Sequence, residues 1–184
     1  DPARSTQIAR DWFSHPYPIF KRLALFAASH DYCITPDQWV EWLVTDNAWW
    51  LWSVETKRET MRLFVLQGHV LTTQAQEKLE ELILSGPPRN MFHEDLDPEE
   101  WKRLVDRNVW LRLAKLQSSG VELGFVASER LAKLSDNHPE WRLANNERDE
   151  FSHWFSMTGD PDFQDSREFI IAPRKKDELV VWLR

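Results

Sequence analysis

Glu147, Glu150 and His153 recur every three residues in the segment NNERDEFSHW, and carboxylate and imidazole side chains are common metal ligands. On a helix, this spacing would gather the three side chains on one side. A metal ion held there would need one more ligand, for example His138, and an open position for the substrate of a hydrolase. The six histidines form no His-x-x-x-His or His-Glu-x-x-His pattern. Because exposed carboxylates on a solvated helix are far commoner than such a site, a metal-dependent hydrolase is kept only as an alternative.

Other catalytic patterns are weak. Cys33 follows His30 at three residues, but this segment is expected to be a loop with no helix N-terminus aimed at the thiol, which favours a half-buried structural cysteine. The sequence contains no Gly-x-Ser-x-Gly elbow and no glycine-rich nucleotide-binding motif. It therefore predicts that the chain is not an enzyme and binds no cofactor, with any catalytic domain lying outside it.

The stretch ILSGPPRNMF, residues 83–92, could be either a phosphate-binding loop or the end of a helix. A phosphate cradle needs successive backbone N–H groups followed by a helix N-terminus, and Pro87 and Pro88 have no N–H to donate. Gly86 stands where a helix needs a residue of positive φ to close its last turn. The structural interpretation is therefore favoured.

Tryptophan is unusually frequent, with eleven residues against two tyrosines. The most distinctive cluster is AWWLWS, which contains Trp49, Trp50 and Trp52 and is expected between two helices. Aromatic residues are enriched in binding hot spots, so these three are candidates for contact with a partner. The favoured alternative is that two of the three wedge between helical hairpins while the third lies flat on the surface.

The bulk composition is that of a folded globular protein of one domain, with 42% hydrophobic and 29% charged residues in a chain of 184. Cys33 is the only cysteine, so no intramolecular disulfide can form, and a reducing cytoplasm is the simplest compartment. No apolar run approaches the ~20 residues that cross a bilayer. The chain begins at Asp1 rather than methionine, which suggests a fragment of a longer protein.

The formal net charge of −7 argues against general affinity for a nucleic-acid backbone. A nucleic-acid-binding α array is kept as a second alternative, which would need four arginines exposed on one continuous face. These are Arg89, Arg103, Arg107 and Arg112. Where the last three are partly buried, they would instead need carboxylate partners such as Asp106 or Glu100.

Only five glycines occur, and several segments space apolar residues at helical intervals, so the fold is predicted to be nearly all α. The clearest stripe runs over 72–85, where Thr73 and Gln76 have the spacing of a capping box. The longest helix is predicted over 98–118, with Asp97 as its cap. Further helices are expected over 4–13, 18–29, 36–44, 54–67, 125–134, 145–155 and 175–183.

These helices are predicted to form a single domain over 1–184, in which 156–174 is an irregular arm. A faint repeat appears at an offset of 40 residues, in which Arg22-Leu23 matches Arg62-Leu63 and Glu41-Trp42-Leu43 matches Glu81-Leu82-Ile83. This period is that of HEAT-like helical pairs, although amphipathic helices can match by hydrophobic pattern alone. In either case, hairpins joined by short loops must bury their stripes against neighbours. The predicted fold is therefore a set of stacked antiparallel helical hairpins, either a HEAT-like α array or an irregular α bundle.

Taken together, four segments resemble a helical region found toward the C-terminus of large bacterial proteins. These are HPYPIFKRLALF, ILSGPPRNMF, DPEEWKRLVDRNVWLRLAKLQ and HPEWRLANNERDEFSHWF. The resemblance covers the chain from about His15 to Phe155. In such proteins the region accompanies N-terminal modules such as SIR2-like NAD hydrolases or STAND-type ATPases, many of them implicated in anti-phage defence. Its motifs are helix boundaries and packing positions, so no functional residue carries over to this chain, which has neither the NAD site nor the ATP site.

The resemblance implies a sensing, scaffolding or oligomerising role. We therefore expect a non-catalytic interaction, sensor or scaffold module of a larger bacterial protein. The expected partner is another protein or the N-terminal effector domain of the same protein, and a homo-oligomer is a further expectation. Nucleic acid and membrane are not expected partners.

Overall fold

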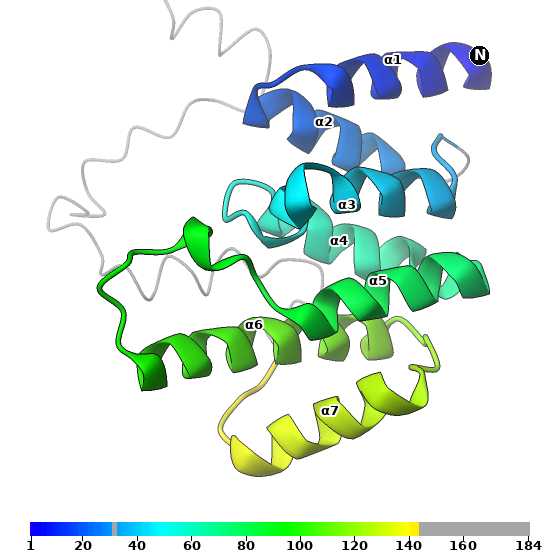
Figure 1. Cartoon of the computed structure of the whole chain (residues 1–184). Coiled ribbons are helices and arrows are strands. Elements are labelled where there is room, and N and C mark those ends of the chain that lie inside the picture. Colours follow the sequence, from blue (N-terminus) through cyan, green and yellow to red (C-terminus); the bar gives the residue numbers. More distant parts are fainter. Residues whose placement is uncertain (31–32, 144–184) are drawn as a thin grey trace, which may run out of the picture. The chain divides into compact units, whose positions relative to one another are not determined.

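The computed structural model describes residues 1–30 and 33–143, in which every regular element is a helix (Figure 1). The chain divides into two compact units, Asp1–Phe151 and Ser152–Arg184. The described residues lie in the first unit. They confirm the predicted all-α fold.

Seven α-helices and two short 3₁₀ turns follow one another in the described residues. They are α1 (Pro2–Ser14), α2 (Pro18–Ala28), α3 (Pro36–Trp52), α4 (Lys57–Gln67), η1 (Gly68–Val70), α5 (Thr73–Ser85), η2 (Arg89–Met91), α6 (Pro98–Ser118) and α7 (Phe125–Asn137). The two predicted C-terminal helices and the arm over 156–174 lie outside the described residues. A single domain over 1–184 therefore stays a prediction.

The helices stack as successive antiparallel hairpins in two layers (Figure 1). In one layer α2 packs on α4 and α4 on α6, while in the other α3 packs on α5 and α5 on α7. The pairs α1 and α2, α3 and α4, and α5 and α6 also pack together, which links the layers. This order is that of stacked helical hairpins, and α2 and α4, which match at the offset of 40, are neighbours in one layer. The HEAT-like repeat itself remains a prediction.

Several of the described helix ends follow from local residues. Asp97 caps α6 by accepting from the backbone N–H groups of Glu99 and Glu100 at 2.9 and 2.8 Å. Gly86 ends α5 with a φ of 77°, the positive value expected from its place in the sequence.

The predicted capping box of α5 is wrong. Thr72, not Thr73, is the extended residue before the helix, and its hydroxyl accepts from the N–H of Ala75 at 3.2 Å. Gln76 therefore stands one position too far into the helix to complete a box. Its side-chain amide instead donates to Glu80.

α3 contains a left-handed turn that separates two right-handed segments. The predicted helix over 36–44 is present, but Asp46, Asn47 and Ala48 have φ values of 54 to 58°. A side chain with a β-carbon is strained in this region, most of all Ala48, which lacks a polar group that could bond the local backbone. The short segment after this turn carries the three clustered tryptophans.

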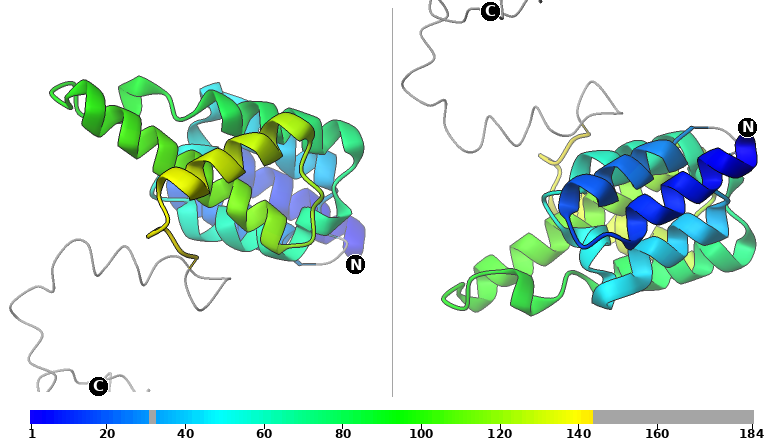
Figure 2. Two further views of the ribbon diagram at one scale, coloured as in Figure 1. Left: turned by 90° about the horizontal axis from the view of Figure 1, so that it is seen from below. Right: turned by 90° about the horizontal axis from the view of Figure 1, so that it is seen from above.

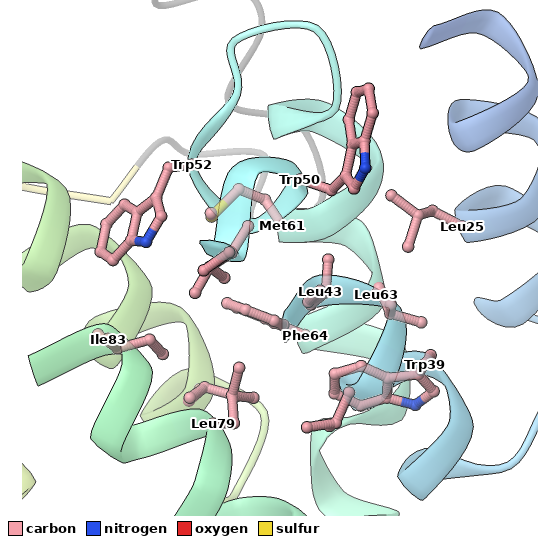
Figure 3. Packing of buried hydrophobic residues seen from close by; sticks show 14 of the residues in the cluster. Leu25, Trp39, Leu43, Trp50, Trp52, Met61, Leu63, Phe64, Leu79 and Ile83 are labelled. Carbon is pink, nitrogen blue, oxygen red and sulfur yellow. The ribbon is translucent and has the colours of Figure 1, made fainter. Parts of the chain in front are cut away.

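The core runs through the middle of the stack (Figure 3). Trp39 of α3 lies against Phe64 of α4, with ring centroids 6.2 Å apart, and Leu79 and Ile83 bring the stripe of α5 to the same cluster. The predicted apolar stripe of α5 is therefore its buried face. Figure 3 also shows Leu25 reaching from α2 toward Trp50, so the first hairpin joins this core on its inner side.

Candidate interaction surface

The tryptophan cluster belongs mainly to the core. Trp50 and Trp52 are 7% and 5% exposed, whereas Trp49 is only partly buried. This is the arrangement in which two of the three indoles wedge between hairpins. Of the three predicted partner contacts, Trp49 alone retains appreciable exposed surface.

Trp50 is held where α1, α2 and α3 meet. Its indole N–H donates to Asp46 of the left-handed turn at 2.9 Å, so the turn places a carboxylate acceptor for a buried ring. Lys21 of α2 donates from Nζ to the carbonyl of Phe13 and lies 4.2 Å from the Phe13 ring centroid and 5.2 Å from that of Trp50. Burial lowers the pKa of Lys21, and the nearby Asp46 charge opposes this shift. Lys21 on the inner side of α2 thus caps the C-terminal end of α1 and contacts the Phe13 and Trp50 rings.

Arg112 of α6 is a second buried cation, and it caps the C-terminal end of α3. Its fully buried guanidinium donates from Nε and Nη2 to the carbonyl of Leu51 at 3.1 and 2.7 Å, and from Nη1 to Asn108. The guanidinium carbon lies 4.1 Å from the Trp52 ring centroid. Burial lowers the pKa of Arg112 to about 9, so the group remains charged at neutral pH. Within residues 1–30 and 33–143, Arg112 does not pair with the expected carboxylate, and its bonds go to the carbonyl of Leu51 in the last turn of α3 and to Asn108.

The other arginines do not form one exposed face. Arg107 lies over the rings of Trp110 and Trp141 at 4.6 and 5.2 Å, while Arg103 is exposed. Asp106, a predicted partner for these arginines, pairs instead with Arg130 of α7. Because Arg112 is buried and Arg107 packs on two tryptophans, the four arginines do not form the continuous exposed face that nucleic-acid binding would need.

The contacts of Arg89 support the structural interpretation of residues 83–92 over a phosphate-binding loop. Its guanidinium donates to the carbonyls of His93 and Glu94 at 2.7 and 2.9 Å and lies 5.0 Å from the Trp101 ring centroid. The stretch after Pro88 therefore curls around its own arginine and rests against α6. This arginine organises the connection rather than facing a ligand.

The predicted metal ligands Glu147, Glu150 and His153 lie outside the described residues. Within residues 1–30 and 33–143, no three histidine, cysteine or acidic side chains are grouped so that they could hold a metal ion. The fourth candidate, His138, stacks on Trp141 with ring centroids 3.9 Å apart.

An open groove of about 740 Å³ lies between α1 and α2. From α2 it is lined by Leu23, which is 37% exposed, and by Phe26, which is 46% exposed. From α1 it is lined by Ile8 and Trp12. Polar groups lie toward one end, where Asp1, Ser5 and His30 contribute to the lining. The right-hand view of Figure 2, from above, shows α1 and α2 side by side, with no other described helix over them.

Cys33 lies at the edge of this groove but forms no pair with His30. The Nδ1 of His30 lies 2.9 Å from the carbonyl of Phe26 and therefore bonds the last turn of α2. Burial raises the pKa of the Cys33 thiol, which leaves less reactive thiolate at neutral pH. These contacts suit a structural cysteine.

Sequence reasoning missed the groove, although the signal was present. In PIFKRLALFAA, the inner positions Lys21, Leu25 and Ala28 face the core, yet Ile19, Leu23 and Phe26 form a second apolar stripe. A helix that is apolar on two sides is expected to be covered on both.

Comparisons with known proteins provide no activity for this surface. No protein-family model and no solved structure matches the chain. The described part contains no helix that is long and apolar enough to span a membrane. The chain is similar to an uncharacterised protein, y4cA, of Sinorhizobium fredii (strain NBRC 101917 / NGR234), with 28% identity over 155 residues. The match covers 82% of this chain but 12% of that protein, so the chain spans a small part of the length of its relative.

Proposed function

We propose that this chain is a non-catalytic interaction module, a HEAT-like helical array that docks amphipathic helices of a protein partner in the groove between α1 and α2. The module acts as a scaffold or sensor of a larger bacterial protein in the cytoplasm. Its resemblance to helical regions of anti-phage defence proteins makes defence the biological setting that we propose.

The observation that carries the proposal is the apolar stripe on the outer side of α2. Ile19, Leu23 and Phe26 are each more than a third exposed, and Ile8 of α1 continues the apolar surface across the groove. Contiguous apolar surface of this kind marks interaction sites on soluble proteins. The paired helices offer the geometry in which an amphipathic helix lays its apolar face into a groove.

A small-molecule site has less support. Such sites place a few polar groups around an apolar cavity so that they converge on the ligand. Here Asp1, Ser5 and His30 gather toward one end, and the Nδ1 of His30 is already engaged with Phe26. The middle of the groove offers apolar contact alone.

The alternatives from the sequence gain no support from the described residues. Nucleic-acid binding would need its arginines exposed together, yet Arg112 is buried and Arg89 holds its own loop. The similarity to part of a much longer bacterial protein favours a module that works alongside other segments.

The proposal is tested by affinity capture with the tagged 184-residue chain in wild-type form and as two matched variants. Leu23→Glu places a charge in the middle of the groove, whereas Val126→Glu changes an exposed apolar residue at the start of α7. Circular dichroism first establishes that both variants fold. We expect proteins retained by the wild type and by Val126→Glu to be lost from Leu23→Glu. Identical retention by all three forms would exclude the groove as the docking site.

A further inference from the structure

We infer that the occupant of the α1–α2 groove is a second copy of this chain, related by a twofold axis so that each α1 lies antiparallel to its counterpart. The inference rests on the proposed function, because it names the partner of the same surface. It follows from the apolar stripes, the symmetry of their arrangement and the charges beside them.

The apolar stripes extend along both helices of the first hairpin. On α2, Ile19, Leu23 and Phe26 follow one another at intervals of four and three residues, which places them on one side of the helix. On α1, Ile8 and Trp12 have the same kind of spacing and line the groove. A partner that presents two apolar helical stripes side by side covers this surface along both helices. A second copy of the hairpin does so.

The apolar groove residues lie near the middle of each helix, which suits a twofold axis. Ile8 lies near the middle of α1 and Leu23 near the middle of α2, and both line the groove. Because the two helices run antiparallel, an axis perpendicular to them can pass near both residues. The same patch then meets itself, as an isologous interface requires.

Charges on α1 select the antiparallel direction. Arg4 and Asp11 are exposed and seven residues apart, so they lie almost in line along the helix, on either side of Ile8. A twofold axis near Ile8 sets Arg4 of one protomer against Asp11 of its partner, twice. A parallel pairing would set like charge against like charge. Asp11 accepts one hydrogen bond from Gln7 at 2.8 Å, and a carboxylate has further lone pairs for an arginine.

The exposed apolar residues of α7 do not offer an equivalent surface. Phe125 and Val126 are adjacent at the start of α7, so they do not form a stripe along that helix. The α1–α2 face is therefore the described surface best suited to self-association.

The expected dimer is a weak one. Two helices ~20 Å long and about 10 Å apart present a face near the lower limit for specific interfaces. We therefore expect a dissociation constant of about 10 µM, so that one concentration series shows both the monomer and the dimer.

The test is sedimentation velocity of the 184-residue chain from about 1 to about 200 µM, a range that brackets the expected dissociation constant. The wild type and Val126→Glu should shift from monomer to dimer with increasing concentration. Leu23→Glu should remain monomeric. Arg4→Glu and Asp11→Arg should each weaken the dimer about tenfold, because two like-charged contacts arise per dimer, and the double variant should restore it.

A wild type that stays monomeric throughout the series would overturn the inference. So would a dimer that tolerates Leu23→Glu, or charge variants whose combination fails to restore association. The two proposals fail in different ways. A monomeric wild type that still loses a captured protein on Leu23→Glu refutes the second copy and keeps the docking groove, whereas no effect of Leu23→Glu in either assay refutes both.

Discussion

α2 and α4 hold neighbouring places in one layer and match at an offset of 40 residues, yet they differ in what covers them. α4 lies between α2 and α6, and Leu63 and Phe64 are completely buried. α2 packs on α4 and on α1, yet Leu23, the residue that Leu63 matches, is 37% exposed. The exposure of a leucine in this layer therefore depends on which described helices pack around it, and not on the residue itself.

The inner side of α2 gives the largest expected effect. Trp50→Ala removes a buried ring that contacts α2 through Lys21, and we expect a loss of about 3 to 5 kcal/mol in the free energy of unfolding. Urea unfolding followed by circular dichroism measures it. Trp49→Ala is the matched control and should cost less, because Trp49 is only partly buried. Equal losses would mean that the two indoles share one environment.

The direct test of the comparison is the pair Leu63→Ala and Leu23→Ala. We expect the free energy of unfolding to fall by about 2 to 5 kcal/mol for the buried Leu63 and by less than about 1 kcal/mol for the exposed Leu23. Both are measured by urea unfolding at a concentration at which the chain is monomeric. If the two losses are similar, another segment already covers Leu23 in solution, and the outer side of α2 is not bare.

Arg112→Met tests the buried arginine of α6 that donates to the carbonyl of Leu51 near the end of α3. The variant leaves the Leu51 carbonyl without its two donors but relieves the desolvation of a buried cation, so we expect a net loss of about 1 to 3 kcal/mol. Arg112→Lys keeps the charge and lacks the planar fork, which separates the two contributions. A more stable methionine variant would show that desolvation outweighs the carbonyl cap.

The smallest effect concerns Cys33 at the edge of the groove. Because burial raises the pKa of this thiol, its thiolate fraction below about pH 9 is smaller than in the unfolded chain. Alkylation by iodoacetamide should therefore be slower in the native protein than in urea, with the rate rising at higher pH than in the unfolded control. Equal pH profiles would indicate that the thiol is fully solvated.

The sequence was most informative where structure depends on near neighbours. The cap at Asp97, the positive φ at Gly86 and the stripe of α5 all depend on residues within a few positions. The left-handed turn was missed although Asp46 and Asn47 are residue types that tolerate positive φ, and only Ala48 carries no signal for it. The bond from Arg112 to Leu51 joins residues 61 positions apart, which helical periodicity cannot reveal.

The candidate site was predictable only in part. The excess of apolar residues in α2 was visible, but which of them would remain exposed depends on the stacking order of whole helices. The tryptophan cluster is distinctive in composition, although two of its three side chains belong to the core. An unusual residue type is thus a weaker guide to a surface than a second apolar stripe on one helix.

The clamp formed by Arg89 has a consequence for proteolysis. Trypsin must draw an arginine side chain into its specificity pocket, where an aspartate recognises the charge. At Arg89 the guanidinium is already bonded to the carbonyls of His93 and Glu94 and rests on Trp101. The connection between α5 and α6 should therefore resist limited digestion even though it joins two helices by a dozen residues outside them, and cleavage there would report that the clamp has opened.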